Sequence, residues 1–190
     1  MNNILKFNDF IKEGFINYLP STNTDSIIEL DKLPIFLKNV EICKNDNYEK
    51  SPYFKEFKKF LSNNKDNVVR LYHGTSSKFN ILETGLKRTK LKSKRSLQSE
   101  QGYVYLSVYP ESAKTFGQFA YPNDDIIVYS VDILIGDLKP DHDQLRNVRL
   151  WNKNSEYGDS LIESLVLGNG ARVKGDIPPY MIKEYKYTLN

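Results

Sequence analysis

The sequence predicts an α+β domain that follows a helical N-terminal region. In the first third of the chain, apolar residues such as Phe7 and Ile11 recur at the three- and four-residue steps of one helix face. From Val68 onwards, short β-branched and aromatic runs alternate with brief helical segments. We therefore expect a helical region over residues 1–66 and an α+β domain over residues 67–190.

Two further helices are expected in the N-terminal region. The first begins at Asp25 or Ser26, whose side chains can cap a helix, and runs to Phe36. The second begins at Pro52, because proline suits the first helical position and Ser51 can cap the helix before it.

The domain that follows is expected to contain several strands with short helices between them. The strands are predicted over residues 68–73, 103–108, 126–131, 161–167, 171–173 and 182–188. Gly168, Asn169 and Gly170 form a turn signal, so the strands on either side of it are expected to pair as a hairpin. A helical turn stopped by Gly85 and a helix opened by Pro110 complete the prediction.

The composition excludes several classes of protein. The 190 residues are 39% hydrophobic and 27% charged, as in ordinary soluble proteins. No apolar run reaches the roughly 18 residues that span a bilayer, so no membrane partner is expected. The single cysteine, Cys43, excludes an internal disulfide framework and a cysteine zinc cluster. A reducing compartment, the cytoplasm, is the predicted location.

Positive charge is concentrated in one segment. The formal net charge of +3 is too small to indicate a partner. The basic segment, residues 87–95, contains Lys87, Arg88, Lys90, Lys92, Lys94 and Arg95. We interpret it as a solvated loop. The alternative is a loop that faces the phosphates of a dinucleotide or of a nucleic acid.

A candidate binding motif stands at the end of the first predicted strand. Tyr72 is followed there by His73, Gly74 and Thr75. Glycine lets a backbone approach a ligand closely because it has no Cβ, and histidine and threonine offer short polar groups. The alternative is a histidine that caps a turn. Three residues alone do not decide between the two interpretations.

Further motifs follow in order along the chain. They are NILETGL from residue 80, YVYLS from residue 103, ESAKTFG from residue 111 and LIESLV from residue 161. With the His-Gly-Thr motif before them, they resemble the ADP-ribosyltransferase superfamily, specifically the His-Tyr-Glu branch shared by poly-ADP-ribose polymerases and diphtheria-like toxins. The resemblance covers about residues 70–182. It implies a split β-sheet core, NAD as the substrate that supplies ADP-ribose, and no metal.

The resemblance assigns the catalytic role to three residues, Glu163, Tyr105 and His73. Breaking the nicotinamide–ribose bond gives the ribose carbon oxocarbenium character, and a nearby carboxylate stabilises that positive charge. Glu163 is the expected carboxylate. The alternative is an acidic residue on the solvent side of a strand, against which its apolar neighbours Ile162 and Leu165 argue.

The expected NAD-binding residues are His73, Gly74, Thr75, Tyr105, Ser107 and Phe116. The resemblance implies that His73 binds a ribose hydroxyl and that the backbone of Gly74 holds the carboxamide. It also implies that Tyr105 stacks on the nicotinamide ring, with Phe116 at a second stacking position. Tyr103 lies on the same face of the predicted strand and is the alternative to Tyr105. Core packing is the alternative for these aromatic rings.

Four functions are consistent with these motifs, and a mono-ADP-ribosyltransferase with a protein or nucleic-acid acceptor is favoured. The alternatives are an NAD glycohydrolase, an RNA 2′-phosphotransferase and a non-catalytic NAD-binding module. The phosphotransferase is included because residues 175–182 of this chain resemble the final strand of that family. The other histidine, His142, lies in the polar segment Pro140-Asp141-His142-Asp143. We interpret this segment as a solvated loop, because so compressed a set of ligands cannot enclose a metal alone. The exact acceptor and the oligomeric state are left open.

Residues 1–13 are predicted to form a short apolar-faced helix that ends in Ile11, Lys12 and Glu13. The pattern resembles the leader peptides of proteins packaged in tailed-phage heads, which are cut after an Ile/Leu-x-Glu site. This resemblance implies a phage-encoded, toxin-like effector that is delivered to the host cytoplasm. The alternative is a helix that simply packs on the domain, since so short a helix is not stable alone.

Overall fold

The computed structural model describes residues 27–44, 47–90, 99–148 and 150–187. The leader predicted at residues 1–13 lies outside the described residues, as do Lys92, Lys94 and Arg95 of the basic segment. The described part is a mixed α+β structure, which confirms the α+β class that the sequence predicts. None of its helices is long and apolar enough to cross a membrane.

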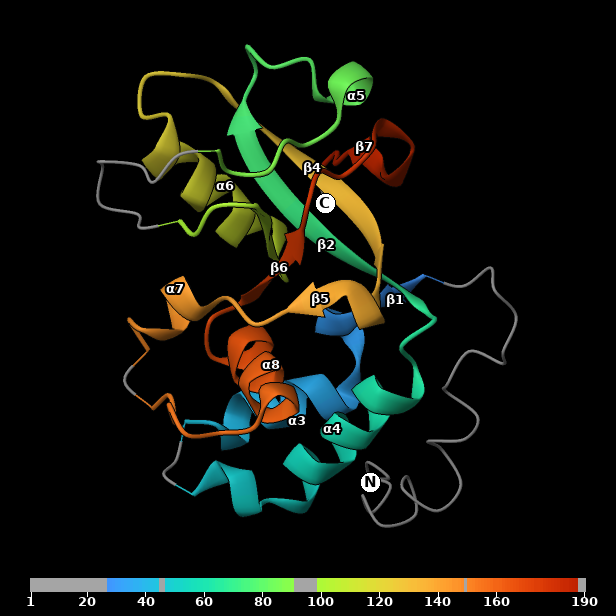
Figure 1. Ribbon diagram of the computed structural model, residues 1–190, viewed down its shortest axis with the longest axis vertical. Coiled ribbons are helices and arrows are strands. Elements are labelled where there is room, and N and C mark those ends of the chain that lie inside the picture. The colour runs from blue at the N-terminus through green and yellow to red at the C-terminus, as the bar shows by residue number, and fades with distance from the viewer. Residues whose placement is uncertain (1–26, 45–46, 91–98, 149, 188–190) are drawn as a thin grey trace, which may run out of the picture.

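The centre of the described structure is a seven-stranded sheet (Figure 1). Its strands are β1 (Ile28–Glu29), β2 (Val68–Ser76), β3 (Tyr103–Ser107), β4 (Ile126–Leu134), β5 (Leu138–Lys139), β6 (Gly170–Lys174) and β7 (Ile182–Glu184). The strand order is β5-β6-β3-β2-β4-β7, and β1 pairs with β2. The β1–β2 pairing is parallel, and the other described pairings are antiparallel.

The sheet divides into two halves that meet at one point. β2 pairs with β4 along its whole length, from Val68 to Ser76, and β3 pairs with β6 along five residues. Between these two ladders, the described pairing of β2 with β3 is the single pair of Tyr72 and Ser107. One half is therefore β5-β6-β3, the other is β2-β4-β7, and the two strands at the junction separate beyond this pair.

The helices pack on this sheet in two groups (Figure 1). They are α3 (Pro34–Ile42), α4 (Pro52–Asn63), α5 (Ile81–Thr84), α6 (Pro110–Ala120), α7 (His142–Leu145) and α8 (Tyr157–Val166). Short 3-10 turns are η2 (Leu30–Lys32), η3 (Tyr48–Lys50), η4 (Ile135–Asp137) and η5 (Pro179–Met181). α3, α4 and α8 contact one another, whereas α6 lies against β2 and β4.

Local signals explain where the N-terminal helices begin. Ser51 accepts a hydrogen bond from the backbone N–H of Tyr53 at 3.3 Å, and Pro52 opens α4, as predicted. The helix predicted from Asp25 or Ser26 is wrong, because β1 and η2 precede α3. A residue before a proline is disfavoured in the helical conformation, so Leu33 is extended and a new helix begins after it.

The strand predicted over residues 161–167 is also wrong, because this segment is the C-terminal part of helix α8 and its end. Its buried apolar residues are Leu161, Ile162, Leu165 and Val166. Such a run fits a buried strand and a buried helix equally well, so its periodicity does not separate the two. β6 consequently pairs with β3 and β5 and not with a hairpin partner at 161–167.

One hydrophobic core joins the N-terminal helices to the sheet. Phe36 of α3 and Phe57 of α4 belong to the same cluster as Leu71 of β2 and Leu165 of α8. All four side chains are fully buried, so residues on both sides of the expected boundary at residue 66 contribute to one interior. The boundary marks a change from helix to strand within that interior.

Gly74 lets helix α6 pack directly on strand β2. A Cβ at Gly74 would lie 2.1 Å from the carbonyl oxygen of Ala113, and a Cβ at Gly117 would lie 2.9 Å from the carbonyl carbon of Gly74. A side chain at either position would clash with backbone. The sequence interpretation linked Gly74 to a close-lying ligand, but the structure shows that it is needed for the close approach of the helix.

Candidate functional site

A cavity of about 890 Å³ lies between β2, β3, α5, α6 and α7. Its lining includes all six residues expected to bind NAD, namely His73, Gly74, Thr75, Tyr105, Ser107 and Phe116. They come from β2, β3 and α6, three segments that are separate in the sequence. The fold therefore brings the predicted binding residues together in one concave site, where the two halves of the sheet separate.

His73 bridges the gap between the two halves. Its Nδ1 lies 2.8 Å from the carbonyl oxygen of Tyr105. Since a carbonyl oxygen only accepts, Nδ1 carries the proton, and Nε2 of the neutral ring remains an acceptor. Burial lowers the pKa of His73, and the hydrogen bond to Tyr105 opposes this only in part. A neutral imidazole with a free acceptor suits a ligand hydroxyl.

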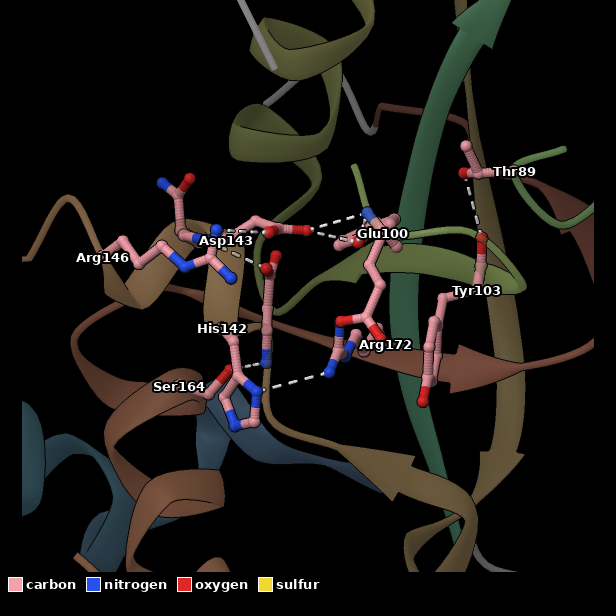
Figure 2. Close-up of polar contacts among 11 residues, drawn as sticks. Thr89, Glu100, Tyr103, His142, Asp143, Arg146, Ser164 and Arg172 are labelled. Carbon is pink, nitrogen blue, oxygen red and sulfur yellow. Dashed lines mark hydrogen bonds and ion pairs between the residues drawn. The ribbon is translucent and has the colours of Figure 1, made fainter. Parts of the chain in front are cut away.

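The phenol of Tyr105 is held in place by polar contacts at its hydroxyl group. It donates to Oδ2 of Asp143 and accepts from the backbone N–H of Glu100 at 2.7 Å. The same N–H lies 3.1 Å from Oδ2 of Asp143. Burial and then the hydrogen bond to Asp143 raise the pKa of Tyr105, so the phenol is protonated. Figure 2 shows Asp143 turned towards Glu100.

Arg172 is a nearly buried cation beside this site. It stands opposite Tyr105 in the ladder between β3 and β6 and is 4% exposed. Its guanidinium forms an ion pair with Glu100 and lies 4.1 Å from the centroid of the Tyr103 ring (Figure 2). It also donates to Nδ1 of His142 at 3.4 Å. Because Arg172 covers one face of the Tyr103 ring, Tyr105 is favoured as the ring that stacks on a ligand.

Basic and aromatic side chains surround the rest of the cavity. Lys78, Lys87 and Arg146 are part of its lining. Phe79 and Tyr121 also line it, and their rings meet edge to face at 5.4 Å between centroids. Lys87 belongs to the basic segment, and its place at the cavity favours the phosphate-facing alternative for this residue.

The polar segment 140–143 is not the solvated loop that the sequence suggested. It leads into α7, and both Asp141 and Asp143 line the cavity. Asp141 caps α7 by accepting from the backbone N–H of Gln144 at 2.9 Å. Burial raises the pKa of Asp141 to about 6. Sequence reasoning missed both residues, although an Asp three residues before Gln144 is a helix N-cap signal that would have placed a folded turn here.

Glu163 does not line the cavity. It lies on α8 with a side chain that is 0% exposed. Its Oε1 accepts from the phenol of Tyr48, and its Oε2 accepts from the hydroxyl of Ser155 at 2.8 Å. Burial raises the pKa of Glu163, although these hydrogen bonds oppose the shift. The fold therefore brings His73 and Tyr105 together and leaves Glu163 apart, because its segment is a helix that faces the core.

Comparison with known proteins identifies no family for this chain. None of the protein-family models matches this chain, and no curated protein shows significant similarity to it. Within the described residues, no group of three or more His, Cys, Asp or Glu side chains is arranged to hold a metal ion.

We predict that His73 stays neutral, with its proton on Nδ1, at pH 6.5. Its pKa is lowered from that ordinary value, so the neutral ring predominates there. Long-range ¹H–¹⁵N NMR spectra report the tautomer of each ring. Because the chain has two histidines, the His142→Gln variant assigns the signals. A His73 ring that is mostly protonated at pH 6.5 contradicts the proposed hydrogen bond.

We predict that Glu163 supports stability and not ligand binding. Glu163→Ala removes packing and the carboxylate that accepts from both Tyr48 and Ser155 in the core, which should cost about 2–5 kcal/mol of unfolding free energy. Glu156→Ala is the matched control, because Glu156 forms an exposed ion pair with Lys58 that is worth about 0–1 kcal/mol. Chemical denaturation measures both. Equal, small losses in the two variants would show that Glu163 does not hold the core.

Proposed function

We propose that this chain binds NAD⁺ in the cavity and transfers its ADP-ribose to a macromolecular acceptor, releasing nicotinamide. One observation carries the proposal. Six residues that the ADP-ribosyltransferase resemblance assigns to NAD binding, from three separate segments, line one cavity. Residues that merely filled the core would have no reason to converge on the same concave surface.

The lining of the cavity suits a dinucleotide in size and chemistry. Its volume of about 890 Å³ falls within the range of roughly 300–1,000 Å³ that holds a drug-sized ligand. Tyr105 and Phe116 offer aromatic rings for a planar base or nicotinamide. Lys78 and Lys87 also line it, and each forms an exposed ion pair, with Asp124 and Asp176 respectively, that a phosphate can replace.

The residues of the site support a substitution at the nicotinamide ribose. The bond between the ribose carbon and the nicotinamide nitrogen breaks, and its electron pair leaves with nicotinamide. A lone pair of the acceptor then forms the new bond to that carbon, and the acceptor's proton passes to solvent. His73 can accept a hydrogen bond from a ribose hydroxyl through Nε2, and Tyr105 holds a flat ring beside it.

A non-catalytic NAD-binding module is the second candidate. The position of Glu163 favours it, because the carboxylate expected to stabilise the reacting sugar is buried away from the cavity. Two other carboxylates, Asp141 and Asp143, do line the cavity, and this keeps a transferase our first choice. An NAD glycohydrolase differs only in using water as the acceptor. An RNA 2′-phosphotransferase differs in needing a 2′-phosphorylated RNA.

Incubation with NAD⁺ labelled in its adenine moiety tests the proposal. We expect the label to appear on macromolecules of a cell lysate, and its release by nuclease or by protease identifies the class of acceptor. Free labelled ADP-ribose without transfer would identify a glycohydrolase. Unchanged NAD⁺ that nevertheless binds the protein would identify a binding module and contradict the transferase.

We predict that Tyr105→Ala weakens NAD⁺ binding by about 1–3 kcal/mol, the loss seen when an aromatic ring that stacks on a base is removed. Tyr103→Ala is the matched variant, because its ring packs on Arg172 and its loss should act mainly on stability. Calorimetric titration of folded protein measures both affinities. A larger loss at Tyr103 than at Tyr105 reverses the assignment.

A further inference from the structure

We infer that Asp143 is the carboxylate that faces the reacting sugar, in the role that the sequence assigned to Glu163. The inference rests on the proposed function, because it names the residue that stabilises positive charge in the same cavity. It starts from a geometric fact that the sequence motifs do not contain. His73, Tyr105 and Asp143 form one hydrogen-bonded unit on the cavity wall.

The unit is organised around Tyr105. The main chain of Tyr105 is held by His73 Nδ1 from strand β2, and its phenol is held by Asp143 from helix α7. The three side chains therefore come from the two halves of the sheet and from α7. Tyr105, the ring expected to stack on nicotinamide, therefore has the neutral imidazole of His73 at its main-chain carbonyl and the carboxylate of Asp143 at its hydroxyl group.

One carboxylate oxygen of Asp143 is accessible to a ligand hydroxyl. Its Oδ2 accepts from Tyr105 and from the backbone of Glu100. Its Oδ1 is 3.6 Å from the guanidinium of Arg146, whose side chain is 56% exposed. So loose and exposed an ion pair contributes little, and a ligand hydroxyl can replace it. The Asp143 side chain is only 16% exposed, so water screens its charge less than at the surface.

The carboxylates of Glu163 and Asp141 already accept hydrogen bonds that hold the fold together. Both oxygens of Glu163 accept hydrogen bonds from Tyr48 and Ser155 in the core. Asp141 caps α7 through Gln144, and its backbone N–H donates to Ser164 at 2.7 Å. Figure 2 shows Asp143 and His142 leaving α7 in different directions, Asp143 towards Glu100 and His142 towards Arg172.

Asp143 could also act only by holding Tyr105, and the variants are chosen to separate these roles. Asp143→Asn keeps an acceptor for the phenol and removes the charge. Tyr105→Phe keeps the ring and removes the phenol that Asp143 holds. If Asp143 works only through Tyr105, the two changes have equal effects and the double variant is no worse than either. If its charge meets the sugar, Asp143→Asn costs more, and the effects combine.

The experiment measures nicotinamide release at saturating NAD⁺ and NAD⁺ affinity by calorimetry. We expect Asp143→Asn to lower kcat by on the order of 100-fold, the cost of removing one preorganised electrostatic group, while the Kd for NAD⁺ changes little. Tyr105→Phe should lower kcat less. Glu163→Gln keeps the shape of a buried side chain outside the cavity and should keep kcat close to that of wild type. Asp137→Asn, on an exposed turn away from the cavity, is the charge-matched control.

The outcomes distinguish a failure of the role inferred for Asp143 from a failure of the proposed function. Among the carboxylate variants, loss of release in Asp143→Asn alone, with a smaller loss in Tyr105→Phe, supports the inference. Loss in Glu163→Gln or Asp141→Asn with Asp143→Asn near wild type overturns it, and so does a Tyr105→Phe variant that reproduces Asp143→Asn with no further loss in the double variant. If wild type binds NAD⁺ but releases no nicotinamide, or does not bind it, the proposed function fails and the inference fails with it. A failure in wild type thus points to the function, and a failure confined to the variants points to Asp143.

Discussion

The architecture depends on how its two half-sheets are joined. The ladder between β2 and β3 has one described pair, Tyr72 with Ser107, and beyond it the strands separate. The His73 side chain spans the opening by donating to the carbonyl oxygen of Tyr105, where a regular sheet would have its next backbone contact. A side chain can turn and present a second polar atom, which a ladder hydrogen bond cannot. The junction therefore creates a cavity and places an acceptor in its wall.

Close packing fixes the opposite wall. Gly74 and Gly117 allow the backbone of α6 to meet β2 at a distance that no side chain would permit. This contact sets the position of Phe116, one residue before Gly117, at the cavity. The glycine in the His-Gly-Thr motif thus acts on the ligand site through a helix. Its neighbours on either side, His73 and Thr75, line the cavity.

The sequence predicted the parts of the site whose signals are local. Strands β2 and β3 and helix α6 begin close to where alternation, glycine and proline placed them, and His73, Tyr105 and Phe116, which the family resemblance singled out, line the cavity. It could not predict α8, because the apolar run around Glu163 suits a buried strand as well as a buried helix. Asp143 was missed for another reason. Its place depends on β5 and β6 lying beside β3, a non-local pairing that no short motif encodes. The leader predicted at residues 1–13 and most of the basic segment lie outside the described residues.

Glu163 illustrates how a residue type can match a motif and serve another purpose. Its carboxylate joins α8 to η3 through Tyr48 and to the preceding loop through Ser155, in the region where the N-terminal helices meet the core. A buried carboxylate is costly unless it is hydrogen-bonded, and both oxygens of Glu163 are hydrogen-bonded.

The crystal structure of the Asp143→Asn protein with NAD⁺ is the most direct test that the cavity holds the nicotinamide ribose beside His73 and Asp143. We expect the nicotinamide ribose to lie in the cavity, within hydrogen-bonding reach of His73 and residue 143. NAD⁺ bound elsewhere, or a ribose in contact with Glu163, would contradict it.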